Sequence, residues 1–293
     1  MTSKNYTIGF IGAGVMGRRM IHNLLKANFR VNVYTRTKEK AEPLLKNGAT
    51  WKDSVAELAR SSQVIITIVG YPSDVEEVYF GEKGILEHAR PNSYVIDMTT
   101  SKPSLAKRIY RVAKEKDIYA LDAPVSGGDI GARNGTLAIM VGGDKDVFLT
   151  MKPIFEVLGE NIMLQGEAGA GQYTKLANQI TIASNMIGVC EAIMFAKKSG
   201  LDPERVLQSI TTGAAGSWSL SNLGPRMIKN DYEPGFYVKH IIKDLRIAIE
   251  AAEEIGLPTP GLELSLKLYK ELANMGESDS GTQSLIKWYT QQQ

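Results

Sequence analysis

The stretch GFIGAGVMG at residues 9–17 has the glycine spacing of a phosphate-binding loop. Gly12, Gly14 and Gly17 form the pattern G-x-G-x-x-G between an apolar run and a helical run. In such a loop the first glycine permits a tight turn, the second lets the backbone approach a pyrophosphate, and the third allows close packing of helix against strand. We therefore predict a dinucleotide site, with a glycine-rich turn that binds no ligand as the alternative. The residues assigned to this site are Gly12, Ala13, Gly14, Val15, Met16 and Gly17.

The residues after the second apolar run indicate which dinucleotide is bound. In NAD-preferring sites this strand ends in Asp or Glu, which binds the ribose 2′-hydroxyl and would repel the 2′-phosphate of NADP. Here the stretch is YTRTKEK at 34–40, and its first carboxylate is Glu39, inside the next helical run. Arg36 can present a planar guanidinium to a phosphate, and Thr35 and Thr37 can donate hydroxyls. We predict NADP as the preferred cofactor and keep NAD as a second candidate; in the alternative, Arg36 is a surface charge and the site accepts both.

A loop with two glycines follows a later strand. The stretch DAPVSGG occupies residues 122–128, after an apolar run, and open parallel sheets bind ligands at such strand ends. The hydroxyl of Ser126 and the backbone N–H groups of Gly127 and Gly128 can bind an anion. A tight loop that only reverses the chain explains the same residues equally well.

A lysine and two amides lie close together on a predicted long helix. In GAGQYTKLANQ at 169–179, Lys175 and Asn178 are three residues apart and share a helix face, and Gln179 lies one turn from Lys175. Partial burial lowers the pKa of a lysine and suits it to proton transfer, and a neighbouring amide can orient it or a substrate hydroxyl. The alternative is a solvated lysine that points away from any site.

Around these motifs, the first half of the chain alternates strands and helices. Apolar runs predict strands at 6–11, 31–34, 64–69, 94–97, 118–121, 137–141 and 161–164. Helical spacing predicts helices at 16–26, 38–46, 74–79 and 104–114. The strands lack regular polar alternation, which indicates a parallel sheet covered on both faces, with 137–141 as an antiparallel candidate. The predicted fold class is α/β, a Rossmann-type doubly wound parallel sheet.

The second half of the chain is predicted to be all-helical. A long helix at 171–198 opens it, and Gly200 is placed to end that helix. Its apolar stripe is Leu176, Ile180, Ala183, Ile187, Cys190 and Met194. Further helices are expected at 203–212, 239–255, 262–274 and 282–289. We therefore predict a dinucleotide-binding domain at 1–165 and an all-helical substrate and oligomerisation domain at 166–293.

Composition limits the classes of partner and compartment. The chain has 293 residues, a formal net charge of +2 and one cysteine, so nothing indicates nucleic acid, and no intramolecular disulfide can form. The polar N-terminus is unlike a signal peptide, and we expect no membrane-spanning apolar run. His22, His88 and His240 are scattered, so no metal site is expected. These features predict a cytoplasmic protein.

Together the motifs resemble those of the β-hydroxyacid dehydrogenases, the family of 3-hydroxyisobutyrate dehydrogenase, tartronate semialdehyde reductase and the glyoxylate and succinic semialdehyde reductases. The resemblance covers nearly the whole chain. It rests on GFIGAGVMG at 9–17, DAPVSGG at 122–128, GAGQYTKLANQ at 169–179 and KDL at 243–245, in that order. It implies an NAD(P)-dependent oxidoreductase that interconverts a short β-hydroxy acid and its aldehyde or keto form, as a homodimer or homotetramer.

The resemblance also implies roles for single residues. Lys175 would be the general acid/base, and Asn178 would orient the substrate. Ser126, Gly127 and Gly128 would hold the substrate carboxylate. The residues implied to contact the cofactor, besides those of the two cofactor stretches above, are Val69, Gly70, Thr100 and Lys243, with Asp244 beside the last.

The chain departs from the family pattern at three places. Thr35-Arg36-Thr37 stands where Asn-Arg-Thr is common, and Val69-Gly70 stands where Leu-Pro is common. Asn178-Gln179 replaces a pair of asparagines, so Gln179 can reshape the substrate pocket and leaves the substrate open among several short hydroxy acids and aldehydes. Two other functions compete: an imine reductase, which usually lacks the lysine, and a non-catalytic dinucleotide-binding protein. Lys175 argues against both.

Overall fold

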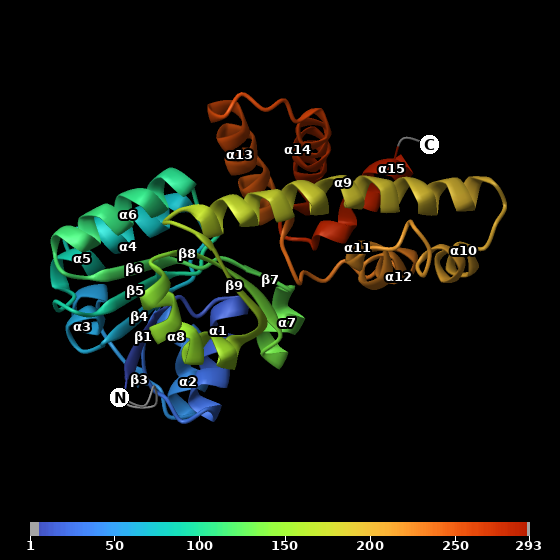
Figure 1. Ribbon diagram of the computed structural model, residues 1–293. Coiled ribbons are helices and arrows are strands. Elements are labelled where there is room, and N and C mark those ends of the chain that lie inside the picture. The colour runs from blue at the N-terminus through green and yellow to red at the C-terminus, as the bar shows by residue number, and fades with distance from the viewer. Residues whose placement is uncertain (1–5, 292–293) are drawn as a thin grey trace. The chain divides into compact units, whose positions relative to one another are not determined.

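The computed structural model describes residues 6–291. The chain forms two compact units, the first ending at Lys175 and the second beginning at Leu176. This division falls inside one continuous helix, α9 (Ala170–Lys198), so no loop separates the units (Figure 1). The domain boundary near residue 165 stays a prediction.

The first unit is built on a nine-stranded sheet. Its strands are β1 (Thr7–Ile11), β2 (Arg30–Tyr34), β3 (Thr50–Trp51), β4 (Val64–Thr67), β5 (Tyr94–Asp97), β6 (Tyr119–Asp122), β7 (Val125–Ser126), β8 (Leu137–Gly143) and β9 (Gly159–Gly166). The first six are parallel in the order β3-β2-β1-β4-β5-β6, which is the order of a Rossmann fold. β8 runs antiparallel to β6 and β7, as expected, and β9 runs parallel to β8.

Helices cover both faces of this sheet (Figure 1). One face packs against α1 (Val15–Lys26), α2 (Glu42–Lys46), α7 (Gly128–Asn134) and α8 (Lys145–Leu158). The other face packs against α3 (Val55–Arg60), α4 (Pro72–Phe80), α5 (Ile85–His88) and α6 (Pro103–Glu115). Within β4, Val64 and Ile66 face the first layer and Ile65 faces the second. Both sides of the strand are therefore apolar, which is why the sequence shows no polar alternation.

Two differences between the predicted and the observed elements of the first unit involve prolines. The expected helix at 38–46 is a 3₁₀ turn (Lys38–Lys40) followed by α2, and Pro43 lies in the first turn of α2, where its missing N–H costs nothing. The helix α8 was not expected at all. It contains Pro153 in its interior, and it is retained because Met151, Ile154, Phe155 and Leu158 are fully buried. Burying such a side chain contributes about 1.5–3 kcal/mol, which offsets one lost hydrogen bond.

The second unit is helical among the residues described, apart from one isolated bridge between Tyr237 and Gly281. It comprises the rest of α9, α10 (Pro203–Ile210), α11 (Trp218–Asn222), α12 (Gly224–Ile228), α13 (Val238–Glu254), α14 (Pro260–Leu272), a π-helical turn (Ala273–Glu277), a 3₁₀ turn (Thr282–Ser284) and α15 (Leu285–Gln291). The short helices α11 and α12 were not predicted, because five residues are too few for a periodic pattern.

The long helix α9 is buried on more than one side. Of the predicted stripe, Leu176, Ala183, Cys190 and Met194 are buried, whereas Ile180 and Ile187 are only half-buried. The other buried side chains of the helix beyond Lys175 are Gln179, Met186, Val189, Ile193 and Ala196. By length and composition alone, α9 is apolar enough to cross a membrane, so the expectation that no run reaches that length was wrong. This is weak evidence for a membrane, because a buried core helix passes the same test.

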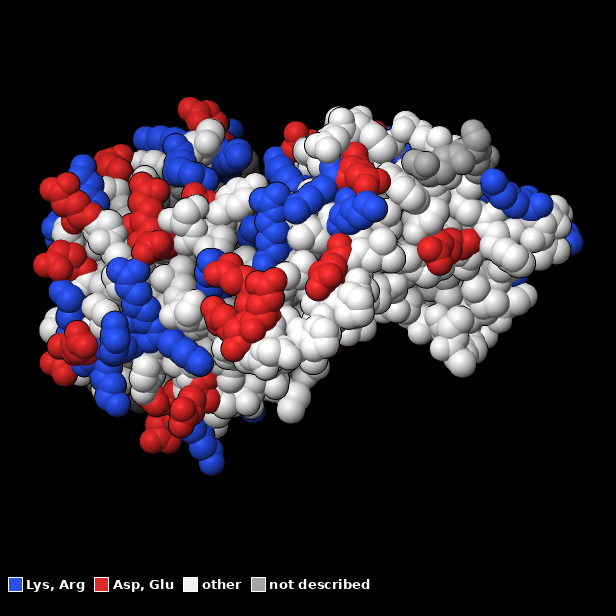
Figure 2. Space-filling model, turned by 90° about the horizontal axis from the view of Figure 1, so that it is seen from above, with Lys and Arg blue, Asp and Glu red and all other residues white. Residues whose placement is uncertain are grey.

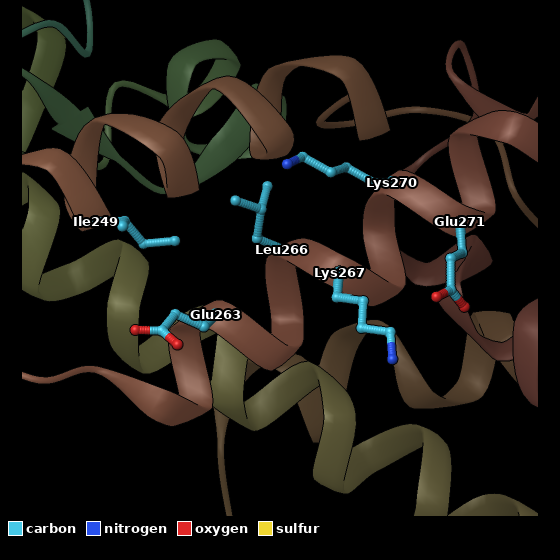
Figure 3. A pocket seen from close by; sticks show the side chains of 6 residues that line it. All are labelled: Ile249, Glu263, Leu266, Lys267, Lys270 and Glu271. Carbon is cyan, nitrogen blue, oxygen red and sulfur yellow. The ribbon is translucent and has the colours of Figure 1, made fainter.

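The face of the molecule seen in Figure 2 does not identify the site by its charge. Acidic and basic side chains are interspersed over the face seen in Figure 2. A shallow pocket of about 270 Å³ lies on α13 and α14 of the second unit (Figure 3). Its lining residues are Ile249, Glu263, Leu266, Lys267, Lys270 and Glu271. None of the predicted site residues lines this pocket, so it does not mark the cofactor site.

Candidate active site at the carboxyl edge of the sheet

The glycine loop has the backbone shape that a dinucleotide requires. Gly12 follows β1 with φ of 106°, which favours glycine, and its N–H donates to the carbonyl of Tyr34 at 2.9 Å. A Cβ at Gly12 would collide with the carbonyl oxygen of Ile68, and a Cβ at Gly17 would collide with that of Gly12. A Cβ at Gly14 would meet nothing within 4 Å, and this glycine is exposed. Gly12 and Gly17 are therefore required by the fold, whereas Gly14 leaves room for a ligand.

The residues that follow β2 lie on the surface beside α4. Arg36 is exposed, and its guanidinium donates to Asp74 Oδ1 at 3.0 Å. The other oxygen, Oδ2, accepts from the backbone N–H of Tyr71 at 3.0 Å, at the start of α4. The carboxylate is thus fixed by the helix, and it holds the arginine at the end of β2. Thr35 is half-buried and Thr37 is exposed.

A buried carboxylate organises the loops that follow β4 and β5. Asp97 Oδ1 accepts from the hydroxyl of Thr67 at 2.8 Å and from the backbone N–H of Thr99 at 3.1 Å. The hydroxyl of Thr99 in turn accepts from the N–H of Val69 at 3.0 Å. Burial raises the pKa of Asp97 to about 6, although the hydrogen bonds from Thr99 and Thr67 oppose that shift. The predicted cofactor residues Val69, Gly70 and Thr100 therefore lie on loops connected through one carboxylate.

The start of α9 is fastened to the ends of β5 and β6 by Asp122 and Gln172, which we call the α9 anchor. Asp122 accepts from the backbone N–H groups of Gly169 at 2.7 Å and Gln172 at 2.8 Å. The side chain of Gln172 donates to the carbonyl of Thr99 at 2.7 Å and accepts from the N–H of Ser101 at 2.9 Å. Burial raises the pKa of Asp122, and the backbone donors oppose the shift.

Lys175 lies one helical turn after the α9 anchor. Only 7% of it is exposed, so it is not the solvated lysine of the alternative interpretation. It is the last residue of the first unit, which also contains the glycine loop and the ends of β4 and β5. A buried lysine on a helix fastened to the carboxyl edge of the sheet has the chemistry of a proton donor or acceptor.

The predicted anion-binding loop reverses the chain between β7 and α7. Ser126 ends β7 and pairs with Ala138 of β8, and it is half-buried. Gly127 and Gly128 have φ of 123° and 61°, and a Cβ at Gly128 would meet nothing within 4 Å. The loop therefore makes the tight reversal and also leaves its backbone accessible at Gly128. Its binding of an anion stays a prediction.

The remaining predicted residues belong to the second unit, where they form a chain of polar contacts. The amide of Asn178 donates to Gln179 Oε1 at 2.8 Å, and Gln179 Nε2 donates to Asp244 Oδ2 at 2.6 Å. Lys243 Nζ lies 2.8 Å from Asp244 Oδ1. Gln179 and Asp244 are each 1% exposed, so they link α9 to α13. The expected contacts of Asn178 and Gln179 with substrate, and of Lys243 with the cofactor, stay predictions.

Four residues important to this arrangement were not predicted: Asp74, Asp97, Asp122 and Gln172. Asp97 and Asp122 each end a strand and pair in register between β5 and β6. Two acidic residues at the ends of apolar runs were a visible signal, since a buried carboxylate needs partners. The signal for Asp74 and Gln172 was weaker, because their partners are distant in sequence. Among residues 6–291 no group of three or more His, Cys, Asp or Glu is placed to hold a metal ion, and the absence of a metal stays a prediction.

The fold and the glycine loop are those of a dinucleotide-binding protein, and matches to two family models identify its class. Residues 7–166 match the NAD binding domain of 6-phosphogluconate dehydrogenase. Residues 169–289 match the NAD-binding domain of NADP-dependent 3-hydroxyisobutyrate dehydrogenase. The chain belongs to the β-hydroxyacid dehydrogenase family, and its cofactor is NADP or NAD.

Relatives of known sequence and structure cover nearly the whole chain. An uncharacterized oxidoreductase of Bacillus subtilis is 64% identical over 96% of this chain and 98% of its own. The 2-hydroxy-3-oxopropionate reductase of Escherichia coli is 41% identical over 96% of each chain. The structure of Mycobacterium tuberculosis 3-hydroxyisobutyrate dehydrogenase with L-serine has a TM-score of 0.87 at 30% identity, over 96% of this chain and 98% of that one. The predicted family and fold class are confirmed.

Proposed function

We propose that this oxidoreductase interconverts a short β-hydroxy acid, with its hydroxyl on the third carbon as in 3-hydroxyisobutyrate, and the corresponding aldehyde or keto form, with Lys175 as the general acid/base. The observation that carries the proposal is the burial of Lys175 one turn after the α9 anchor. The nicotinamide, when bound, supplies or accepts the hydride. In reduction, the ammonium of Lys175 gives a proton to the developing alkoxide; in oxidation, its neutral amine takes the proton from the hydroxyl.

The names of the relatives support the class of substrate. The Escherichia coli relative is named for 2-hydroxy-3-oxopropionate, and the Mycobacterium tuberculosis structure is described with L-serine. Both molecules carry a carboxylate and an oxygen on the third carbon. The backbone at Ser126, Gly127 and Gly128 suits the carboxylate, and this fixed end would hold the reacting carbon in position. Asn178, supported by Gln179, orients the substrate hydroxyl.

The preference for NADP is proposed from the end of β2. The first residue after that strand is Thr35, where an NAD site would carry a carboxylate. Arg36 is exposed and held in place by Asp74, so its guanidinium is available to pair with a 2′-phosphate. An imine reductase or a non-catalytic dinucleotide-binding protein is not favoured, because the relatives at 30% identity or more that bear functional names are dehydrogenases or reductases of hydroxy acids.

The proposal extends to self-association through the second unit as a homodimer or homotetramer. Large apolar side chains are exposed there, among them Phe195 at 73% and Trp218 at 56%. Such residues are enriched where protein surfaces associate. Light scattering on the purified chain measures the mass directly.

The decisive experiment replaces the lysine. We expect Lys175→Met to lower kcat by about 10²–10⁴-fold, because the proton transfer loses its partner. The affinity for NADP, measured by quenching of protein fluorescence, should change little. The matched control is Lys197→Met, an exposed lysine in the last turn of the same helix, which should leave both quantities unchanged. If Lys175→Met kept more than a tenth of the wild-type kcat, the acid/base role would be refuted.

A substrate panel tests the rest of the proposal. We expect kcat/KM to be highest for short acids with the reacting oxygen on the third carbon, 3-hydroxyisobutyrate among them. It should fall steeply for matched alcohols that lack the carboxylate, since the fixed end of the substrate would then be lost. Equal turnover of acids and alcohols would refute a carboxylate site.

A further inference from the structure

The contacts of Gln172 go beyond what a helix needs at its start. Asp122 alone accepts the N–H groups of Gly169 and Gln172 and so caps the first turn of α9. The side chain of Gln172 instead reaches away from its own helix. It donates to the carbonyl of Thr99 at 2.7 Å and accepts from the N–H of Ser101 at 2.9 Å, and it is completely buried.

These two bonds join the helix that carries Lys175 to the loop after β5. Thr99 is itself fixed from two sides, because its N–H donates to Asp97 and its hydroxyl accepts from the N–H of Val69. Between Thr99 and Ser101 lies Thr100, a predicted cofactor contact. Gln172 thus bonds the first turn of α9 to the loop after β5. Through Thr99 and Val69, that loop is in turn bonded to the loop after β4.

The packing leaves this turn little freedom along the sheet. A Cβ at Gly171 would lie 2.7 Å from the carbonyl oxygen of Asp122 and 2.8 Å from its side chain. A Cβ at Gly142 of β8 would lie 2.8 Å from the N–H of Gly171. The helix therefore rests directly on backbone at Gly171. One turn before Lys175, the side-chain amide of Gln172 adds two hydrogen bonds that oppose movement of this turn relative to the loop after β5.

We infer that Gln172 is a positioning residue that sets the place of the Lys175 amine relative to the cofactor loops. This inference rests on the proposed function, since it assumes that Lys175 transfers the proton. Both side-chain hydrogen bonds of Gln172 go to backbone groups of Thr99 and Ser101, so we assign it an indirect role. Its effect on the rate comes through the orientation of α9, where a misplacement of about 1 Å can reduce a rate about 10²-fold.

The experiment compares Gln172→Ala with a matched control, Gln63→Ala. Gln63 also uses its side chain for a backbone bond, to the N–H of Thr7 at 2.7 Å, but at the opposite edge of the sheet and exposed. A second variant, Gln172→Asn, removes only one methylene and keeps the protein folded if the alanine variant fails to fold. In both Gln172 variants the bonds from Asp122 to α9 remain, because they involve backbone N–H groups.

Two readouts separate a positioning role from a structural one. Hydrogen exchange followed by mass spectrometry should show faster exchange at Ser101, whose N–H loses its acceptor, and no change there in Gln63→Ala. Titration with NADP measures the number of intact cofactor sites. In the Gln172 variants, kcat per intact site should fall about 10–100-fold. The affinity for NADP should stay within about threefold of the wild-type value. Activity that falls only in proportion to the number of sites would overturn the inference, as would unchanged exchange at Ser101.

A double variant distinguishes this inference from the proposed function itself. If Gln172 acts through Lys175, then Gln172→Ala should slow the Lys175→Met enzyme no further, because the group it positions is gone. Independent, multiplicative losses would overturn the positioning role. A wild-type rate in Lys175→Met alone would instead refute the proposed acid/base, whatever the exchange at Ser101 shows.

Discussion

At the scale of single residues, the site depends on charges held by partners rather than on isolated side chains. Arg36 is the example at the surface. Its partner Asp74 is fixed by the N–H of Tyr71, so the guanidinium is kept beside the end of β2 at a small cost in entropy. An exposed ion pair of this kind contributes at most about 1 kcal/mol to stability. The contact with Asp74 therefore adds little to stability, and under the proposed function it would hold the guanidinium ready for a phosphate.

The first prediction concerns cofactor selection by this arginine. Arg36→Ala should lower kcat/KM with NADP by about 10–100-fold, since a charge-assisted hydrogen bond contributes about 1.5–3 kcal/mol. With NAD, which has no 2′-phosphate, the change should stay within about twofold. Steady-state kinetics with both cofactors measure the difference, and Arg60→Ala, an exposed arginine at the end of α3, is the control. An equal loss with both cofactors would contradict the assignment.

At the scale of elements, the turn from β1 to α1 separates what the fold needs from what the ligand needs. Gly12 and Gly17 are in contact with backbone oxygens, so their missing side chains serve packing. Gly14 faces open space with φ of −72°, a conformation that any residue adopts. Its missing side chain therefore serves only a molecule that approaches the loop from outside.

The second prediction follows from that contrast. Gly17→Ala should destabilise the protein by about 1–3 kcal/mol, because the new methyl must displace the carbonyl of Gly12. Gly14→Ala should leave the melting temperature of the free protein unchanged or slightly raised, yet weaken NADP binding at least tenfold. Thermal unfolding without cofactor and NADP titration test both. Equal effects of the two substitutions on stability would show that the glycines do not divide their roles in this way.

At the scale of the whole molecule, the first unit retains two buried carboxylates that reduce its stability. Asp97 and Asp122 pair in register at the ends of β5 and β6, and each has a raised pKa because burial disfavours its charge. The hydrogen bonds that these two side chains accept order the loops after β4 and β5 and the start of α9. Burial of these two carboxyl groups therefore lowers the stability of the folded state at neutral pH, while their hydrogen bonds fix the loops at the carboxyl ends of the strands.

The third prediction is a pH dependence of stability. The native pKa of Asp97 is about 6 and its unfolded value is about 4, so between these values the native state holds more protons than the unfolded state. Stability should therefore fall as pH rises from 4 to 6, by as much as about 3 kcal/mol. Asp97→Asn keeps an acceptor for Thr67 and Thr99 and should remove the part of this fall that Asp97 causes, while the part caused by Asp122, whose pKa is also raised, remains. Melting curves of the wild type and of Asp97→Asn, recorded from pH 4 to 8, measure this difference. If the stability of the two proteins changed with pH in the same way, the raised pKa of Asp97 would be contradicted.

The parts of the fold predicted from sequence are those with local signals. The strand at 94–97 and the start and end of α9 were predicted to within one residue. Both signals, an apolar run and a helical spacing of apolar residues, can be detected in one short segment of the chain. Gly200 follows the end of α9 with φ of 74°, as expected. The first unit also contains helices that were not predicted: α3, α5, α7 and α8. Their short length or an internal proline makes the helical period hard to detect, and burial against the sheet decides their formation.

The sequence by itself determined the family and the glycine loop and singled out Lys175 as the candidate acid/base, because each signal consists of residue types at fixed spacing along a few consecutive positions. Only the tertiary structure showed which groups these residues bond to. Asp74 pairs with Arg36, Asp97 accepts from the N–H of Thr99, and Gln172 donates to the carbonyl of Thr99 in the loop after β5. These pairs join residues 2 to 73 positions apart, most of them on different elements. Hydrogen bonds of that kind follow from how strands align and helices pack, which no local pattern of residues specifies.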